Sequence, residues 1–165
     1  MKKFKTIILG EEMKCELKKI VGEDEPFLFE VYASTRKQEI DSWGWSSEQK
    51  ELFLSLQWRA QQASYKQKFP NANHYVVLYE NECVGRCITE ELLEYHHLID
   101  LSILPSYQGK GIGTFIIKQL QKKAKNEDKP VILHVFHTNP ARHLYERIGF
   151  QRIGADELYV KMQWQ

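Results

Sequence analysis

The stretch LSILPSYQGKGIGTFIIKQL, from Leu101 to Leu120, joins an apolar strand pattern to an amphipathic helix pattern. Three glycines, Gly109, Gly111 and Gly113, stand on alternate positions where the helix is expected to begin. Backbone N–H groups at a helix N-terminus are free, and the helix dipole favours an anion there. Glycines leave these groups uncovered and permit unusual backbone angles. The stretch therefore predicts either a phosphate cradle or a plain glycine-rich turn.

Two familiar phosphate motifs do not fit this stretch. The dinucleotide fingerprint G-x-G-x-x-G, counted from Gly109, has Thr114 at its last position. A Walker A loop requires Ser or Thr after its lysine, whereas Lys110 is followed by glycine. A nucleotide-binding protein of another kind is therefore the weakest alternative. The pattern that does fit is Q-x-x-G-x-G, at Gln108, Gly111 and Gly113.

Length and composition indicate a single globular domain over residues 1–165. Hydrophobic residues make up 42% and charged residues 27%, with 23 basic against 22 acidic side chains. This balance gives no electrostatic footprint for nucleic acid. No apolar run reaches the roughly 18 residues of a membrane helix, and the run at residues 6–9 is too short for a signal peptide. Three scattered cysteines argue against a disulfide framework, so we expect a cytoplasmic protein.

Two helices are predicted in the first half of the chain. The acids and Pro26 of GEDEP favour a helix start, and Leu28, Val31, Tyr32 and Thr35 recur at helical spacing. Ser46 and Gln49 form a capping-box pattern for a second, longer helix that ends near FPNAN. The buried stripe of this second helix is predicted at Leu52, Leu56, Ala60 and Ala63.

The second half of the chain alternates between strand and helix patterns. Residues 74–89 predict a hairpin that turns at 80–82, and residues 95–104 predict a third strand. Residues 129–136 predict a strand buried on both faces, and residues 150–165 two closing strands. These elements give one α+β domain with a mixed sheet. The helix after the glycines should bury Ile112, Phe115, Ile116, Gln119, Leu120 and Lys123 and expose Lys118, Lys122 and Lys125.

A second motif, NPARHLYERIGF, runs from Asn139 to Phe150. Asn139 fits an N-cap, Pro140 the first helical position and Gly149 a left-handed C-terminal residue. Together with LPSYQGKGIGT, this motif makes the chain resemble the GNAT superfamily of N-acetyltransferases over essentially its whole length. The resemblance implies a central splayed mixed β-sheet flanked by helices, with acetyl-CoA entering between two separating parallel strands.

The resemblance also implies where the co-substrate acetyl-CoA binds. The strand over residues 98–104 would present backbone groups to the pantetheine arm, and amides of the glycine segment would receive the pyrophosphate. Asn139 would hydrogen-bond the cofactor arm, and Tyr145 would lie beside the thioester sulfur. The implied cofactor-binding residues are Leu101, Ser102, Ile103, Gln108, Gly109, Lys110, Gly111, Ile112, Gly113, Thr114, Asn139 and Tyr145.

Acetyl transfer to an amine requires a base for the amine and an acid for the departing thiolate. Tyr145 is the implied acid, because a phenol pKa near 10 roughly matches that of an alkyl thiolate. Family members often carry a glutamate on the strand before the glycine motif, and His97 stands at that position here. We therefore expect Tyr145 and His97 to be catalytic and His97 to share a strand face with Ile99 and Leu101. The alternatives to His97 are Glu91, Glu94, His96, Asp100 or a water chain.

Other polar and aromatic residues have simpler explanations. Cys83 and Cys87 are predicted to be small core residues on one strand face, since they lack further ligands at zinc-like spacing. His134 and His137 at a strand end do not predict a metal site. Trp43 and Trp45 are equally consistent with an aromatic wall of an acceptor pocket over residues 39–45 and with a core anchor.

We therefore predict an N-acetyltransferase that moves the acetyl group of acetyl-CoA directly to a primary amine of a small molecule or peptide, without a metal. A non-catalytic module that binds or senses acyl-CoA is the alternative. The chain is expected to be a monomer or homodimer without nucleic-acid or membrane partners.

Overall fold

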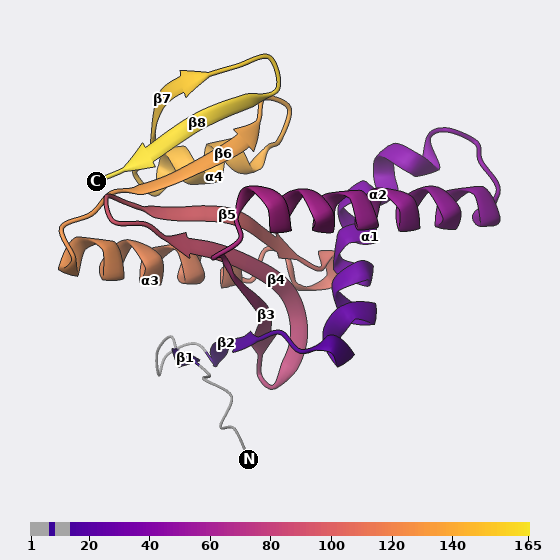
Figure 1. Cartoon of the computed structure of the whole chain (residues 1–165), viewed down its shortest axis with the longest axis horizontal. Coiled ribbons are helices and arrows are strands. Elements are labelled where there is room, and N and C mark those ends of the chain that lie inside the picture. The colour runs from indigo at the N-terminus through magenta and orange to yellow at the C-terminus, as the bar shows by residue number, and fades with distance from the viewer. Residues whose placement is uncertain (1–6, 9–13) are drawn as a thin grey trace.

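The computed structural model describes residues 7–8 and 14–165, so the short apolar run at residues 6–9 lies largely outside the described residues. Within the described part, one mixed sheet of eight strands is flanked by helices (Figure 1). The helices are α1 (Glu25–Asp41), α2 (Ser47–Lys68), α3 (Ile112–Asn126) and α4 (Ala141–Arg147). The strands are β1 (Ile7–Ile8), β2 (Cys15–Lys19), β3 (Asn73–Tyr79), β4 (Glu82–Glu91), β5 (His96–Ile103), β6 (Val131–Phe136), β7 (Gln151–Ala155) and β8 (Tyr159–Trp164).

The strands follow the order β1-β2-β3-β4-β5-β6-β8-β7, and β5 and β6 are the parallel pair. These two strands pair only from His96↔Val131 to Leu98↔Leu133. Beyond this point they diverge, and Figure 1 shows β6, β7 and β8 turning away from the rest of the sheet. The predicted α+β fold with a splayed mixed sheet is confirmed.

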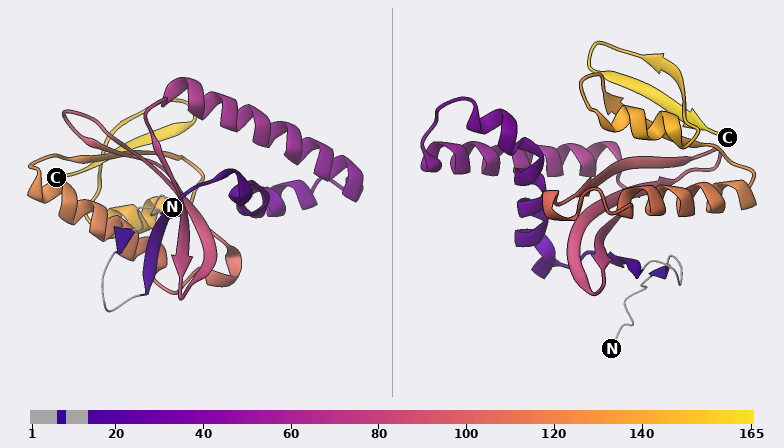
Figure 2. Two further views of the ribbon diagram at one scale, coloured as in Figure 1. Left: turned by 60° about the horizontal axis from the view of Figure 1, so that its bottom comes forward. Right: turned by 180° about the vertical axis from the view of Figure 1, so that it is seen from behind.

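The helices cover the two faces of the sheet in pairs. Neighbouring residues of β3 point to opposite faces. Val76 packs with Trp58 of α2 and with α1, whereas Val77 packs with Ile116 of α3. Tyr145 of α4 packs against the same cluster as Val77 and Ile116. Thus α1 and α2 lie on one face, which we call the α2 face, and α3 and α4 on the other, the α3 face (Figure 2).

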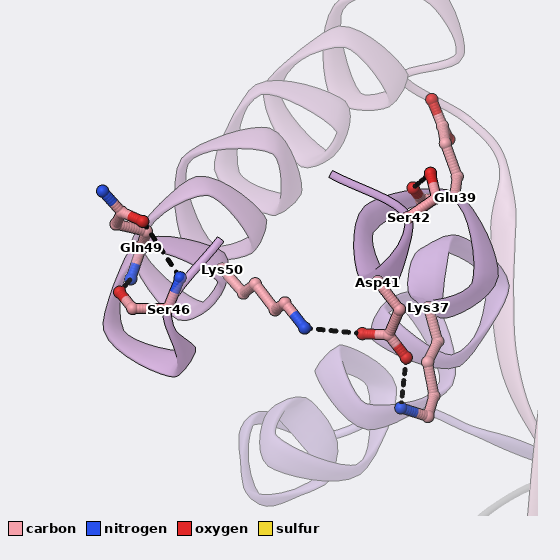
Figure 3. Close-up of polar contacts among 7 residues, drawn as sticks. All are labelled: Lys37, Glu39, Asp41, Ser42, Ser46, Gln49 and Lys50. Carbon is pink, nitrogen blue, oxygen red and sulfur yellow. Dashed lines mark hydrogen bonds and ion pairs between the residues drawn. The ribbon is translucent and has the colours of Figure 1, made fainter. Parts of the chain in front are cut away.

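Local sequence explains the connections. Glu80 and Asn81 both adopt positive φ, 50° and 66°, as a two-residue hairpin turn requires. At the start of α2, the Ser46 side chain accepts the Gln49 N–H, and the Gln49 side chain accepts the Ser46 N–H. This confirms the predicted capping box, which Figure 3 shows beside the α1–α2 contact. In the same view Asp41 of α1 accepts hydrogen bonds from Lys37 and from Lys50 of α2, which ties the helices together at the surface.

The predicted buried stripe of α2 is wrong. Leu52 and Leu56 are 64% and 54% exposed, and Ala60 and Ala63 are exposed as well. The helix instead turns Trp58, which is 6% exposed, toward the sheet. Leu54, Gln61 and Tyr65 lie on the same side of the helix as Trp58, partly buried. The predicted stripe and the row around Trp58 both have helical spacing. The row around Trp58 includes the polar Gln61, so it was not recognised as the core face.

Four smaller expectations also need correction. Lys123 of α3 is exposed and bonded to Glu91, while Ile117 and Ala124 fill the inner side. On β6, His134 and Phe136 are exposed because α2 does not cover that end of the strand. Cys83 is exposed beside the hairpin turn, where a bulge interrupts the β3–β4 register. Helix α4 begins at Ala141, one residue later than predicted, although Asn139 caps its first turn as predicted.

The close contact of β4 with β5 depends on Gly85. A Cβ at this position would lie 2.3 Å from the Ser102 carbonyl oxygen and 2.8 Å from Ile103 Cδ1. Backbone cannot yield as a flexible side chain can, so we expect Gly85→Ala to lower the free energy of unfolding by about 1–3 kcal/mol. Denaturant unfolding measures this value. Gly154→Ala, where a Cβ meets nothing within 4 Å, is the matched control and should change stability little. Equal stability of the two variants would contradict the tight β4–β5 packing.

Candidate functional site

The glycine segment forms a row of unbonded amides at the N-terminus of α3. Gly109 and Gly111 adopt φ of 77° and 80°, a region that glycine enters without strain. Phe115 is the first residue of α3 whose N–H bonds within the helix, to the Gly111 carbonyl. The six N–H groups of residues 109–114 make no hydrogen bond to any described residue. The fold therefore leaves a positive helix end with its donors open, which is the chemistry an anionic group requires.

Gln108 is part of this loop but not of the open row. Its N–H donates to the Pro105 carbonyl, and its side-chain Nε2 donates to the Ile103 carbonyl at 2.9 Å. The prediction that the Gln108 amide is free for pyrophosphate is thus wrong. Its side chain instead fixes the loop to the end of β5.

Gly113 differs from the other two glycines. It is the second residue of α3, and a Cβ there would meet only Leu101 Cδ2 at an ordinary 3.8 Å. The fold itself does not require glycine at this position, although glycine weakens a helix relative to alanine. The fold alone therefore does not account for glycine at position 113, whereas close approach of a ligand to the backbone would.

The edge of β5 continues from this loop into the splay. Backbone groups alternate between the two neighbours of a strand. The Leu104 N–H donates to Val84 of β4, so the backbone groups of Ser102 also face β4, and those of Leu101 and Ile103 face the gap beside β6. The expectation that Ser102 offers backbone groups to a pantetheine arm is therefore wrong. Its hydroxyl instead donates to Asp100 at 2.8 Å.

A bulge marks the point where the sheet splits. Thr89 of β4 pairs with Leu98, and the preceding residue Ile88 pairs with Asp100, so Ile99 is an extra residue in β5. The insertion reverses the alternation of side chains. Leu101 consequently packs in the α3-face cluster, whereas His97 contacts Phe69 at the end of α2. The expectation that His97 and Leu101 share a face is wrong for this reason.

Tyr145 of α4 lies on the α3 face beside the splay. Its ring packs edge-to-face against Phe150, with centroids 5.8 Å apart, and joins the core cluster around α3. Burial raises the pKa of its hydroxyl to about 12, and the charges of Asp100 and Cys87 add to this effect. The hydroxyl makes no hydrogen bond to another described residue. Tyr145 thus holds a protonated donor with no structural task.

Asn139 stands at the other side of the opening, after β6. Its Oδ1 accepts the Ala141 N–H at 2.9 Å, which caps the first turn of α4. The side chain is exposed, and its amide nitrogen has no partner among the described residues. Capping and contact with a ligand are therefore compatible.

His97 lies on the α2 face at the last stretch of β5–β6 pairing. The side chain is 7% exposed, and its ring contacts Phe69 and His134 with centroids 5.3 and 5.6 Å away. Burial, together with the nearby His134 and Lys161, lowers its pKa to about 4. His97 is therefore neutral at physiological pH, with a ring nitrogen able to accept a proton.

The other predicted bases are engaged elsewhere. Glu91 pairs with Lys123 at the surface, and Glu94 is exposed in the β4–β5 connection. His96 points to the face opposite His97 and shares a 2.8 Å hydrogen bond with Glu127. The Glu127 pKa is lowered by this bond.

Asp100 belongs to a buried polar network on the α2 face. Its carboxylate pairs with Arg86, whose side chain is 4% exposed and which lies over the Trp58 ring at 5.3 Å. Gln61 of α2 accepts a further Arg86 N–H at 3.3 Å. Separating such a buried pair typically costs about 3–5 kcal/mol. Asp100 is therefore committed to binding Arg86 and is not a free base.

Sequence reasoning missed Glu90. This residue is 8% exposed and pairs directly with His97 across the β4–β5 ladder, so both side chains lie on the α2 face. Alternation of Arg86, Ile88 and Glu90 along β4 would have placed it on this face. The pairing with His97 depends on the bulge at Ile99, which no sequence signal announced.

One cavity lies away from these residues. A cavity of about 340 Å³ is bordered only by α1 and α2, among others by Ile40, Asp41 and Leu54. Ile40 and Asp41 belong to the region predicted for an acceptor pocket, residues 39–45, but no predicted catalytic or cofactor-binding residue lines this cavity. Trp43 and Trp45 pack edge-to-face with Phe53 at the far end of these helices, away from α4 (Figure 1). Trp43 and Trp45 are 38% and 39% exposed, so the core-anchor explanation is wrong, and the acceptor wall stays a prediction.

The buried state of His97 generates a pH-dependent stability. Its folded pKa of about 4 lies below its ordinary value of 6.5, so the unfolded chain binds more protons between these values. The contribution of neutral His97 to the free energy of unfolding is therefore complete above pH 6.5 and is lost as the pH drops toward 4. For His97 alone the loss from pH 7 to pH 5 is about 2 kcal/mol. His97→Phe, which keeps the aromatic contacts, should remove this loss in urea unfolding at the two pH values. An unchanged pH dependence would contradict the buried, neutral histidine.

Comparison with known proteins identifies the family to which this architecture belongs. The acetyltransferase (GNAT) family model matches residues 30–150. A ribosomal protein bS18-alanine N-acetyltransferase from Haemophilus influenzae is 34% identical over 80 residues, which are 48% of this chain and 55% of that protein. The chain thus matches about half the length of this relative.

Two solved structures share the fold. The PaiA N-acetyltransferase of Thermoplasma acidophilum in complex with coenzyme A has a TM-score of 0.69 at 19% identity, over 93% of this chain and 99% of that one. A GNAT family acetyltransferase from Elizabethkingia anophelis with acetyl-CoA bound has a TM-score of 0.54 at 16% identity, over 62% and 82%. Among the described helices, none has the length and apolarity needed to cross a bilayer. Because the family model spans most of the sequence, the chain belongs to the GNAT acetyltransferase family.

Proposed function

We propose that this protein transfers the acetyl group of acetyl-CoA to a primary amine. The observation that carries the proposal is the presence of two neighbouring sets of open backbone groups, the N–H groups of residues 109–114 and the edge of β5 beyond its pairing with β6. A pyrophosphate joined to an amide-bearing arm is one of the few ligands that would bind both the amide row of residues 109–114 and the edge of β5. Co-crystallised coenzyme A or acetyl-CoA in structures of the same fold supports this assignment.

In the proposed complex, the pyrophosphate lies against the amides of Gly109 to Thr114, where the α3 dipole favours its charge. The pantetheine arm then runs along β5 and bonds to the backbone of Leu101 and to the N–H of Ile103, whose carbonyl already accepts the Gln108 side chain. Asn139 contacts the arm from the β6 side through its free amide nitrogen. This path leads the thioester to the vertex where β5 and β6 separate.

The acceptor amine approaches from the α2 face. A lysine-like amine has a pKa of roughly 10.4 and must lose a proton before attack. Of the predicted side-chain bases, His97 is the one on this face that is free of an ion pair. Its low pKa makes it a weak base, so positioning of the two reactants supplies most of the rate. A free N–H of the splayed strand stabilises the oxyanion that forms.

Tyr145 serves the departing thiolate from the α3 face. A thiol pKa is roughly 8.5, below the value of about 12 for Tyr145, so the phenol hydrogen-bonds to the thiolate more readily than it gives up its proton. Burial excludes competing water from this contact. The role of Tyr145 as an acid is thus mainly that of a hydrogen-bond donor in the transition state.

Direct transfer is favoured over an acetyl-cysteine intermediate. Burial raises the pKa of Cys15 to about 11 and that of Cys87 to about 12. The pKa of exposed Cys83 is raised as well, mainly by burial of part of its side chain. A thiol must be ionised to act as a nucleophile, so none of the three is activated. The acyl group therefore passes within a ternary complex.

Thiol release tests the proposal against the alternative of an acyl-CoA-binding module. Acetyl-CoA is mixed with the protein and a panel of amines that includes small amines and peptides with alanine at the N-terminus. The peptides are included because the Haemophilus relative is named for such a substrate. Coenzyme A should appear only with an acceptor amine. Binding of acetyl-CoA without turnover on any amine would favour the non-catalytic module.

Gly113→Asp separates the role of the loop in binding from its role in folding. An acid in the first turn of a helix is favourable, and α3 has none there. We therefore expect unchanged or slightly higher thermal stability but a Kd for coenzyme A raised at least about tenfold, because the carboxylate competes with the pyrophosphate. Calorimetry measures the Kd. Ser47→Asp in α2 makes the same charge change away from the site and should not affect it. Equal affinities would exclude this amide row as the anion site.

Tyr145→Phe removes only the unpartnered hydroxyl. A hydrogen bond to a charged group is worth about 1.5–3 kcal/mol, so kcat should fall about tenfold to a hundredfold. The KM for acetyl-CoA and the melting temperature should change little, since the hydroxyl bonds no described residue. Steady-state kinetics measure both constants. Tyr75→Phe, in the same α3-face cluster, is the control. An unaltered kcat would remove Tyr145 from the mechanism.

A further inference from the structure

The outer side of α2 carries an apolar stripe that nothing in the described chain covers. Leu52, Leu56 and Ala63 fall within about 40° of one another around the helix, and Ala60 borders them. All four are exposed, the leucines by 64% and 54%, and they lie opposite buried Trp58. In the left view of Figure 2, α2 lies along the outer edge of the molecule. Stripes of this kind are typical of helix–helix contacts.

The charges at the two ends of the stripe are of opposite sign. Glu48 lies at its N-terminal end and Lys66 at its C-terminal end, eighteen residues or about five full turns apart. They therefore stand on the same flank of the stripe. Both are exposed, and neither forms an ion pair with another described residue. A surface with an acid at one end and a base at the other is complementary to itself when reversed.

We propose that this stripe binds a second copy of the chain, with the two α2 helices packed antiparallel about a twofold axis near Gln57. In this arrangement Leu52 of each copy meets Ala63 of the other, a large side chain against a small one. Glu48 of each copy meets Lys66 of the other, because a twofold axis perpendicular to the helices brings the same flanks together. The midpoints of both pairs fall at or beside Gln57, so one axis satisfies both.

Self-complementarity is what selects a second copy over another partner. A different protein would need only an apolar stripe, whereas an isologous pair requires matched size and charge on the two halves of the same helix. Arg59 is exposed and lies about 20° from Leu52 around the helix, so in the proposed dimer its aliphatic stem can cover the leucines while its guanidinium stays in water. One helix pair about 33 Å long is small beside a standard interface, so we expect a weak, concentration-dependent dimer.

Sedimentation velocity from about 1 to 300 μM tests the dimer without reference to activity. The parent chain should shift from monomer to dimer across this range. Leu52→Gln/Leu56→Gln should raise the dimer Kd at least about tenfold, with an unchanged melting temperature because both side chains are exposed. Leu93→Gln/Leu158→Gln, which alters leucines exposed by 90% and 61% elsewhere, is the matched control and should dimerise as the parent does.

Charge reversal tests the antiparallel orientation. Glu48→Lys and Lys66→Glu should each raise the dimer Kd about threefold to tenfold, because each creates two like-charge contacts. An equimolar mixture of the two variants should recover the parental affinity, since both contacts then join opposite charges. The proposal is overturned by a parent that is monomeric at 300 μM, by leucine variants that dimerise as the parent does, or by a mixture that shows no recovery. Catalysis by a strictly monomeric protein would leave the acetyltransferase proposal intact.

Discussion

The early end of the β5–β6 ladder is the constraint on which the site depends. Parallel pairing stops at Leu98↔Leu133, and the extra residue Ile99 sits at that point. Strand edges that lose their partner must find other hydrogen-bond partners, since buried backbone groups are seldom left unpaired. In this protein they face a gap that continues into the open amides of the glycine loop. The sheet thereby exchanges its own hydrogen bonds for the capacity to bind an extended amide-bearing ligand.

The two faces of the split sheet are chemically distinct. On the α3 face, the helix N-terminus and Tyr145 supply hydrogen-bond donors, which suit an anionic cofactor and a departing thiolate. On the α2 face, His97, Glu90 and the aromatic ring of Phe69 surround the vertex with groups that can accept protons or contact an amine. The buried Arg86–Asp100 pair holds β4, β5 and α2 in register behind this face. The two groups of side chains thus approach the same point of the sheet from opposite faces.

Much of this arrangement follows from sequence because the relevant signals are local. The capping box at Ser46 and the left-handed residue Gly149 each depend on a few neighbouring residues, and both predictions are confirmed. Gly109 and Gly111 adopt positive φ for the same local reason, whereas Gly113 is helical. The α2 stripe was misassigned because two apolar rows of equal period run along one helix. Periodicity cannot say which row faces the sheet, and the true inner row includes the polar Gln61.

Expectations about β5 failed for a different physical reason. A single inserted residue reverses the facing of every side chain beyond it, so Leu101 moved away from the face of His97. Ser102 was assigned to the cofactor although its backbone serves β4, and Glu90 was overlooked although it opposes His97. Register and bulges depend on the partner strand and are invisible in a single strand pattern. The glycine and tyrosine motifs therefore located the site, whereas its fine geometry required the assembled sheet.

Backbone amide NMR during titration with coenzyme A tests the central claim most directly, because it reports on each free donor separately. The account predicts large, saturable shifts for the N–H groups of residues 109–114 and for Leu101 and Ile103. It predicts much smaller shifts for Gln108 and Ser102, whose N–H groups already face partners within the protein. Saturable binding with shifts confined to the α1–α2 hollow, or no binding at all by the folded protein, would contradict it.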